Sequence, residues 1–503
     1  MAGNATDTRQ PWFSMQLHHA LRLPPAELSV VTLVGAGGKT SALFRLAGEA
    51  VAGGRRVVTT TTTHIFAAQA EQTPARLEVT PDSTGAIDWA ALEAQLAQHG
   101  HCLIWVPPNA RATSAGGPTD PSLTGSKRQG LPPRVVDALA ARAGDLGISL
   151  IAIEGDGSRR RPVKAPAPHE PVIPSCTTHL VPVAGLDGLG LPLDAPYVHR
   201  PEQVRALLQE DNASTRLTPR MLGRLLVEPY GQGVRSKERG KRTPFSSASR
   251  PRGARLAPLL NKADSAPRLA AARLIAQWLA QQNQPALIGA VGPESRTAVR
   301  ERWGATTAVV LAAGESRRMG QPKQLLRWRG EPLATRAARI ALDSGASETI
   351  VVTGAVGEQV EAALAPLREA GRGRLRVVFN PAWQDGQAGS VRAAVAALPA
   401  ACEAVLFLPV DQPRLPAALL RRLWQAWRGG SDLAAVAVDG AVRGAPAVFD
   451  RRYFGLLQRV EGDRGGGALL RQHAAEVEAI ETPGNWLADV DTPEDWQSAV
   501  AGG

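Results

Sequence analysis

Short runs rich in apolar residues recur along the chain, and many end at a glycine or a polar residue. Runs of this length and composition predict buried β-strands. In the first half they are 28–34, 55–63, 102–106, 148–153 and 286–291, and in the second half 307–311, 348–353, 375–379 and 404–410. Helical patterns lie between several of them, at 42–52, 333–342 and 356–367. Strands that alternate with helices predict right-handed βαβ units, so we expect an α/β protein with mostly parallel sheets.

The length of 503 residues is too great for one ordinary core, so two or three domains are expected. We place one domain at 28–292 and another at 304–503. No apolar run reaches the roughly 18 residues of a membrane helix, and the N-terminus lacks a signal-peptide core. The widely spaced Cys102, Cys176 and Cys402 form no CxxC pair, which argues against disulfides and zinc and fits a cytoplasmic protein without a membrane partner.

The formal net charge of +11 is concentrated in one segment, 231–256. That segment holds eight cations and one anion, 8 − 1 = +7, and is rich in Gly, Ser and Pro. Such a composition is typical of a disordered, solvated loop. An RNA-binding or partner-binding arm is the alternative, but no interleaved aromatic residues suggest base stacking, so we expect no nucleic-acid partner.

The stretch 306–323, TTAVVLAAGESRRMGQPK, combines a buried strand with a glycine-containing basic loop. Glycines allow backbone N–H groups to approach an anion, and Arg317, Arg318 and Lys323 would neutralise it. A solvated basic loop after a turn is the simpler alternative. The fixed order of strand, glycine loop, paired arginines and lysine favours an anion site.

This stretch resembles the L-A-A-G-x-S-x-R-M-G-x-x-K signature of the nucleotidyltransferases that mature molybdenum cofactor, in the cytidylyltransferase form. Every fixed position is present. The resemblance implies a three-layer, Rossmann-like transferase domain that uses CTP and Mg²⁺. It implies nucleotide contacts from the strand end and loop, Leu311, Ala312, Ala313 and Gly314, and catalytic neutralisation of the triphosphate by Arg318 and Lys323.

Three further segments of the second half continue the resemblance. The apolar strand 404–410 ends at Asp411, and a carboxylate at a strand end needs a charged partner such as Mg²⁺. The family's D-x-P aspartate has that role, and the terminal D-x-D-T-P-E-D motif implies that Asp491 is the second metal carboxylate. Ser390 and Arg392 correspond to a segment that lies by the nucleotide and acceptor, although Ser390 could simply cap a helix. Ala445 stands where many relatives have histidine, so whatever that side chain contributes to acceptor contacts is absent here.

The first half has its own glycine loop. Strand 28–34 runs into GAGGKTS, followed by a helix, and this order is typical of a phosphate cradle. There Gly37 and Gly38 would allow close approach, Lys39 would reach the phosphates and Thr40 would bind Mg²⁺. The match to a P-loop is imperfect because Leu33 stands where the first glycine is expected, and a plain turn is the alternative.

The pieces GAGGKTS, VTTTTTHI, EGDGSRRRPVKAPAPHEPVIP, GLDGLG, VHRPE and LNKAD resemble the YqeC-type accessory proteins of selenium-dependent hydroxylases. That resemblance covers roughly 28–292 and carries no secure catalytic chemistry. Within it, Asn261, Lys262 and Asp264 form an N-K-x-D pattern like the guanine reader of P-loop GTPases, in which a carboxylate accepts two base N–H groups.

Together these patterns predict a transferase that joins CMP from CTP to the phosphate of molybdopterin-type cofactor and releases pyrophosphate. The first half would be a nucleotide-binding accessory domain, and an apo molybdenum hydroxylase is the expected partner. Two alternatives remain open. One is a transferase for another phosphorylated acceptor, such as a sugar or polyol phosphate. The other is a cofactor-carrying chaperone with a vestigial transferase.

Overall fold

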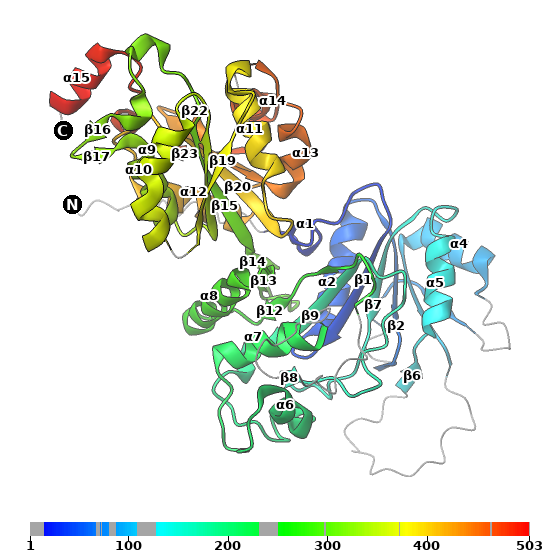
Figure 1. Cartoon of the computed structure of the whole chain (residues 1–503). Coiled ribbons are helices and arrows are strands. Elements are labelled where there is room, and N and C mark those ends of the chain that lie inside the picture. Colours follow the sequence, from blue (N-terminus) through cyan, green and yellow to red (C-terminus); the bar gives the residue numbers. More distant parts are fainter. Residues whose placement is uncertain are drawn as a thin grey trace, which may run out of the picture. The chain divides into compact units, whose positions relative to one another are not determined.

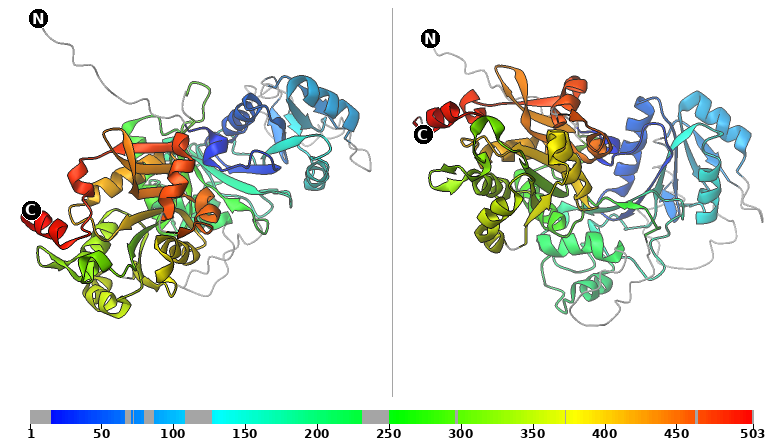
Figure 2. Two further views of the ribbon diagram at one scale, coloured as in Figure 1. Left: turned by 90° about the horizontal axis from the view of Figure 1, so that it is seen from above. Right: turned by 45° about the horizontal axis from the view of Figure 1, so that its top comes forward.

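The computed structural model describes residues 15–66, 71, 73–79, 87–107, 127–230, 250–295, 298–371, 373–462 and 465–501. The chain forms two compact units: Met1–Leu279 with Gln284–Arg302, and Ala280–Asn283 with Trp303–Gly503. Figure 1 labels their elements, and the same colours follow the chain in the two views of Figure 2.

The first unit is built on a ten-stranded sheet. The strand order is β14-β13-β12-β9-β1-β7-β2-β5-β4, with β11 also pairing β9. The strands are β1 (Ser29–Gly35), β2 (Arg56–Thr61), β4 (Arg76–Glu78), β5 (His101–Trp105), β7 (Ile148–Glu154), β9 (His179–Gly185), β11 (Arg255–Leu256), β12 (Leu259–Asn261), β13 (Ala286–Gly289) and β14 (Val299–Trp303). The central strand β1 is buried throughout and pairs in parallel with β7 and β9.

Helices cover both faces of this sheet. They are α1 (Leu17–Ala20), α2 (Lys39–Ala52), α4 (Trp89–His99), α5 (Pro133–Ala141), α6 (Pro201–Leu208), α7 (Pro219–Val227) and α8 (Ala266–Gln281). Alternate residues of β1 point to opposite faces. Val31 packs with α1 and α2, whereas Val30 packs with α4 and α5. Two small sheets, β3 (His64–Phe66) with β6 (Lys127–Gln129) and β8 (Val163–Lys164) with β10 (Val198–His199), complete the unit.

Two features of the first unit differ from the sequence-based expectations. Strand β14 lies in the segment 292–304, which falls between the two domains placed from the sequence and for which no strand was predicted. Strand β11 occupies the end of the predicted basic loop 231–256, because Arg255 and Leu256 pair in parallel with β9. Residues 231–249 of that loop lie outside the described residues.

The second unit contains a seven-stranded sheet of order β19-β18-β15-β20-β22-β21-β23. The strands are β15 (Ala305–Ala312), β18 (Glu348–Thr353), β19 (Leu375–Phe379), β20 (Cys402–Pro409), β21 (Leu433–Val438), β22 (Ala441–Asp450) and β23 (Val477–Glu481). The first four in the order are parallel, but β22 is antiparallel to both β20 and β21. The sheet is therefore mixed rather than purely parallel, because β21 and β22 form a hairpin.

Helices make the second unit a three-layer structure. They are α9 (Leu333–Asp343), α10 (Gly357–Ala370), α11 (Gln387–Ala396), α12 (Ala417–Gly429), α13 (Phe454–Leu457), α14 (Gly465–Gln472) and α15 (Pro493–Ala501). One core joins a sheet face to α9, α10 and α12, and the other joins the opposite face to α11, α13 and α14. A small hairpin, β16 (Arg327–Trp328) with β17 (Glu331–Pro332), follows the basic loop. The α/β class with parallel-rich sheets is thus confirmed, whereas a P-loop in the first unit stays a prediction.

In both units the glycine-containing loop leaves a central strand where the chain changes direction across the sheet. From β15 the chain continues to β18 and β19 on one side, and later returns to β20 on the other side. Ligands of open α/β sheets bind at the carboxyl ends of strands beside such a point. The loops after β15 and β20 therefore lie at the edge of the sheet where a ligand is expected to bind.

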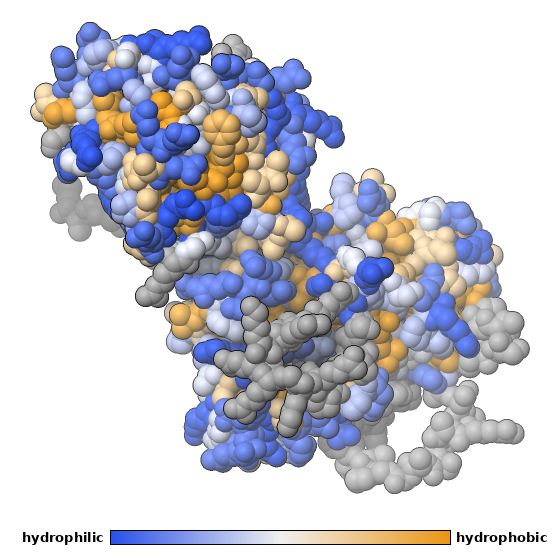
Figure 3. Space-filling model, viewed as in Figure 1, coloured by the Kyte–Doolittle hydropathy of each residue, from blue (hydrophilic) through white to orange (hydrophobic). Residues whose placement is uncertain are grey.

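Hydrophilic residues cover most of the face seen in Figure 3, with apolar residues showing between them. Within the described part of the chain, no helix is both long and apolar enough to cross a membrane.

Candidate active site

The loop after β15 has a buried beginning and an exposed continuation. Ala312 and Ala313 are 1% and 4% exposed, and Gly314 is exposed. The methyl of Ala313 packs close to Gly354, because a Cβ placed on residue 354 would lie 2.9 Å from the Ala313 Cβ. The Ala313 side chain is thus part of the packed interior, and the exposed part of the loop begins at Gly314.

Gln324, which the motif analysis did not single out, holds this loop together. Its side chain is 1% exposed. Its Nε2 donates to the carbonyl oxygens of Ala312 (3.0 Å) and Gly314 (2.6 Å), and its Oε1 accepts from Ser316 Oγ (3.2 Å). Ser316 Oγ also accepts from the backbone N–H of Lys323 (3.1 Å). These bonds fix the backbone at both ends of the loop.

The fixed loop directs Lys323 to two carboxylates from other parts of the chain. Lys323 Nζ lies 2.7 Å from Asp411 Oδ2 and 2.6 Å from Asp491 Oδ1. Asp411 follows β20, and Asp491 precedes α15. Arg318 Nη2 donates to the other oxygen of Asp491 at 2.8 Å. The structure therefore brings together four residues singled out in the sequence: Arg318, Lys323, Asp411 and Asp491.

The charges of this cluster shift one another's protonation. Burial acts to lower the pKa of Lys323, but Asp411 and Asp491 raise it above its ordinary value overall. Burial acts to raise the pKa of Asp491, but hydrogen bonding and charge from Lys323, then Arg318, lower it overall. Both groups are therefore held in their charged forms at neutral pH.

A third carboxylate, Asp489, was not singled out in the sequence as a site residue. Its Oδ1 accepts from Gln412 Nε2 at 3.1 Å, and the neighbouring Val490 N–H donates to the Asp411 carbonyl at 3.0 Å. Burial, followed by the charge of Asp411, raises the pKa of Asp489. The two bonds tie the D-x-D segment to the loop after β20. The pattern D-x-D alone was a signal that could have found this residue.

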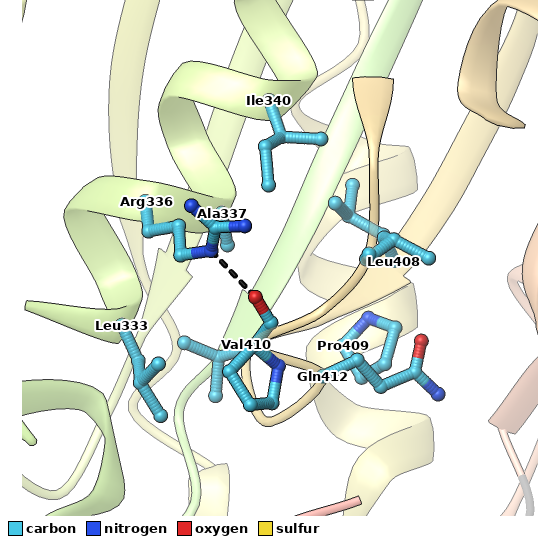
Figure 4. A pocket seen from close by; sticks show the side chains of 10 residues that line it. Leu333, Arg336, Ala337, Ile340, Leu408, Pro409, Val410 and Gln412 are labelled. Atoms are coloured by element: carbon cyan, nitrogen blue, oxygen red, sulfur yellow. Dashed lines mark hydrogen bonds between the residues drawn. The ribbon is translucent and has the colours of Figure 1, made fainter. Parts of the chain in front are cut away.

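The loop after β20 is also supported from α9, next to a small pocket (Figure 4). Arg336 Nε donates to the Pro413 carbonyl at 2.6 Å. The pocket is lined by Leu333, Arg336, Ala337, Ile340, Leu408, Pro409, Val410, Gln412, Pro413 and Leu415. Most of these side chains are apolar. They therefore pack against the loop after β20 and offer few groups that could bind a phosphate.

The carboxylate pair has the chemistry of a Mg²⁺ site. Oxygens of Asp411 and Asp491 converge on one cation, the Lys323 ammonium, and these two carboxylates would hold the ion. Within the described ranges, no group of three His, Cys, Asp or Glu residues is arranged to hold a metal. Two carboxylates are nevertheless enough for Mg²⁺, which commonly takes one or two and completes its shell with water and substrate phosphates.

Ser390 and Arg392 have structural contacts in this structure. Ser390 is 5% exposed and its Oγ accepts from Asn380 Nδ2 at 3.2 Å. Arg392 Nη1 donates to the Val460 carbonyl at 2.6 Å. These bonds connect α11 with its surroundings, and a nucleotide role for either residue stays a prediction.

In the first unit, the loop between β1 and α2 is packed tightly. A Cβ on Gly37 would lie 2.2 Å from the Gly185 backbone nitrogen, so only glycine fits there. Lys39 is 3% exposed, and its Nζ donates to the Gly35 carbonyl at 2.7 Å. The same ammonium lies 3.4 Å from Asp156 Oδ1 and 3.6 Å from Glu154 Oε1.

The neighbouring residues of this loop complete a polar cluster. Thr40 Oγ1 donates to Glu154 Oε2 at 2.8 Å. Asn261 Nδ2 donates to the Gly37 carbonyl at 2.8 Å, while its Oδ1 accepts from Val291 N–H at 3.0 Å. The asparagine therefore ties the glycine loop to the ends of β12 and β13.

Lys262 and Asp264, the other members of the N-K-x-D pattern, pair with residues outside the glycine loop. Lys262 Nζ lies 2.6 Å from Asp187 Oδ2, and Arg268 Nη1 lies 2.8 Å from Asp264 Oδ1. The Asp264 side chain is 54% exposed.

Comparison with known families assigns the two units separately. The family described as YqeC protein matches residues 31–202, and the MobA-like NTP transferase domain matches residues 308–477. The chain therefore belongs to the MobA-like NTP transferases through its second unit, and its first unit is similar to the YqeC family. The predicted fusion of these two families is confirmed.

Individual relatives cover one unit each. An uncharacterized YqeC protein of Escherichia coli is 37% identical over 34% of this chain, which spans 57% of that relative's length. In the second unit, the nicotine blue oxidoreductase of Paenarthrobacter nicotinovorans is 34% identical over 37% of this chain and 93% of its own length. A probable molybdenum cofactor guanylyltransferase of Opitutus terrae is 34% identical over 38% of this chain and 93% of its own length. The molybdenum cofactor cytidylyltransferase of Escherichia coli is 28% identical over 39% of this chain and 95% of its own length.

Proposed function

We propose that the second unit transfers CMP from CTP to the phosphate of molybdopterin-type cofactor. The observation that carries this proposal is the convergence of Lys323, Asp411 and Asp491 at the end of β20. A cation and a carboxylate pair beside an exposed glycine loop suit a triphosphate with its metal. The relatives named as molybdenum cofactor transferases support the acceptor.

In this reaction an oxygen of the acceptor phosphate attacks the α-phosphorus of CTP. One P–O bond forms, the bond to the β-phosphate bridging oxygen breaks, and its electron pair leaves with pyrophosphate. Asp411 and Asp491 would hold Mg²⁺, which neutralises phosphate charge when bound. Arg318 and Lys323 add positive charge at the same place, and Gly314 allows close backbone approach. Phosphoryl chemistry of this kind depends mainly on positioning and electrostatics.

Pyrophosphate release by the full chain tests this proposal. CTP and GTP would each be offered with molybdopterin-type cofactor, a sugar phosphate and a polyol phosphate. Release only with CTP and the cofactor supports the proposal. Release only with a sugar or polyol phosphate favours a transferase for that acceptor, and no release with any pair favours a cofactor-carrying chaperone.

The variant Asp411→Asn tests the metal role within that assay. It keeps the side-chain shape and removes the charge, so transfer should fall by about a hundredfold or more. Asp343→Asn at the exposed end of α9 makes the same change away from the site and should leave turnover unchanged. Equal turnover of Asp411→Asn and wild type at saturating Mg²⁺ would contradict the assigned role.

For the first unit, we propose binding of a purine nucleotide at the Gly37–Thr40 loop. The favouring observation is that Lys39, Thr40 and Asn261 meet Glu154 and Asp156 at the carboxyl ends of β1, β7 and β12. Calorimetry of the full chain with ATP and GTP tests it. Lys39→Ala should weaken purine binding and leave cytidylyl transfer near wild type. Absence of binding for both purines would leave the loop as a plain turn.

An apo molybdenum hydroxylase is the proposed recipient of the finished cofactor.

A further inference from the structure

The Lys323 ammonium lies between the two carboxylates that are proposed to hold a divalent cation. Its Nζ lies 2.7 Å from Asp411 and 2.6 Å from Asp491, and these two carboxylates belong to different segments of the chain. The Lys323 side chain is 16% exposed. We propose that Lys323 is an internal counter-ion that holds this carboxylate pair together before metal binds. When a divalent cation arrives with a nucleotide, Lys323 turns from the carboxylates to the triphosphate. This inference rests on the proposed nucleotidyl transfer.

The electrostatics explain why a counter-ion is needed. Two carboxylates that share a site repel each other and disfavour double ionisation. Lys323 Nζ lies 2.7 Å from Asp411 and 2.6 Å from Asp491, and Arg318 Nη2 lies 2.8 Å from Asp491, so these two cations offset the repulsion. The same ammonium must leave before a metal ion can bridge the two oxygens. A metal ion alone would therefore bind weakly, because it must break two ion pairs of Lys323 and leaves the displaced ammonium without a new anionic partner.

A bound triphosphate changes that balance. It offers the displaced ammonium new anionic partners, so metal and nucleotide should strengthen each other's binding. The backbone N–H of Lys323 donates to Ser316 Oγ, whereas the four-carbon lysine stem is intrinsically flexible, so the movement requires only a change of side-chain rotamer. Buried Gln324 next to it keeps the loop in place. The motion is therefore confined to one side chain.

Titration of the full chain with Mn²⁺, followed by electron paramagnetic resonance, tests the inference without measuring transfer. In Lys323→Met the stem remains and the charge is lost. Mn²⁺ alone should then bind about tenfold more tightly than to wild type, within the roughly 5–150-fold range of typical coupling energies. Lys323→Arg keeps a cation and should restore weak binding.

The matched control is Arg327→Met on the hairpin that follows the loop. It removes the same charge, but Arg327 donates to the Gly330 carbonyl instead of the carboxylate pair. Its Mn²⁺ affinity should stay within about twofold of wild type, which separates the specific contact from the change in net charge. Circular dichroism would check folding, and Lys323→Gln gives a second variant if Lys323→Met is unstable.

The second arm measures CTP affinity by calorimetry with and without Mn²⁺. Coupling is reciprocal, so Mn²⁺ should tighten CTP binding in wild type, and Lys323→Met should reduce that enhancement. Unchanged or weaker Mn²⁺ binding by the Lys323→Met and Lys323→Gln variants would overturn the inference, as would a wild type without coupling. Coupling in a protein that releases no pyrophosphate would instead contradict the proposed function alone.

Discussion

Replacement of Gln324 by leucine should loosen the loop that carries Arg318 and Lys323. Leucine has a similar size but cannot donate to the carbonyls of Ala312 and Gly314 or accept from Ser316. Ala312 is 1% exposed, so its carbonyl loses a buried partner at a cost of about 1–3 kcal/mol. The other two bonds contribute about 0.5–1.5 kcal/mol each. After a partial offset from the more apolar side chain, we expect a net loss of about 2–4 kcal/mol.

Scanning calorimetry of the full chain measures this loss. For a unit of about 200 residues, it corresponds to a fall of roughly 5–15 °C in the transition that reports the second unit. Hydrogen exchange of peptides from 311–325 would localise the effect, because the Lys323 amide depends on the position of Ser316. Transfer should fall by about a hundredfold, as a displacement of about 1 Å in the positioning of reactive groups commonly does.

Gln321→Leu is the matched control, since the same substitution falls on an exposed position of the same loop. It should leave the transition and the exchange pattern unchanged. If Gln324→Leu behaved like this control, the three side-chain bonds would not determine the loop conformation, and the reasoning would be wrong.

Three further predictions concern acidity, base choice and domain independence. Burial lowers the pKa of His101 to about 4, so the folded state binds fewer protons than the unfolded state between about pH 4 and 6.5, and stability falls as pH falls through that window. Urea titrations at pH 7 and at pH 4.5 would give the free energy of unfolding of each protein. Between these pH values His101→Gln should lose less of it than wild type, and equal losses in the two proteins would contradict this. CTP should exceed GTP in kcat/KM, by about tenfold to two-hundredfold if the discrimination is steric; a wild type that prefers GTP in competition would contradict cytidylyl transfer. A fragment of residues 304–503 should fold and transfer CMP alone, and an insoluble or inactive fragment beside an active full chain would show dependence on the first unit.

The sequence by itself determined the α/β class and the two families. Strand-forming runs and glycine loops are local patterns, so β15, β20 and the loops after them could be read directly from the chain. The sequence also indicated Arg318, Lys323, Asp411 and Asp491, because their motifs carry charges at strand ends. Their roles stay predictions.

Only the tertiary structure decided which of these charges meet. Lys323 is separated from Asp411 by 88 positions and from Asp491 by 168, and their contact depends on how β15 and β20 pair. The same packing turned the Ala313 methyl toward Gly354 and gave Gln324 three partners, which no local pattern indicates. It also made β14 and β11 strands, because neighbouring strands offered backbone partners to segments with little strand signal of their own. A sequence shows the chemistry available at each position, whereas distances between remote positions follow from the packing of the whole sheet.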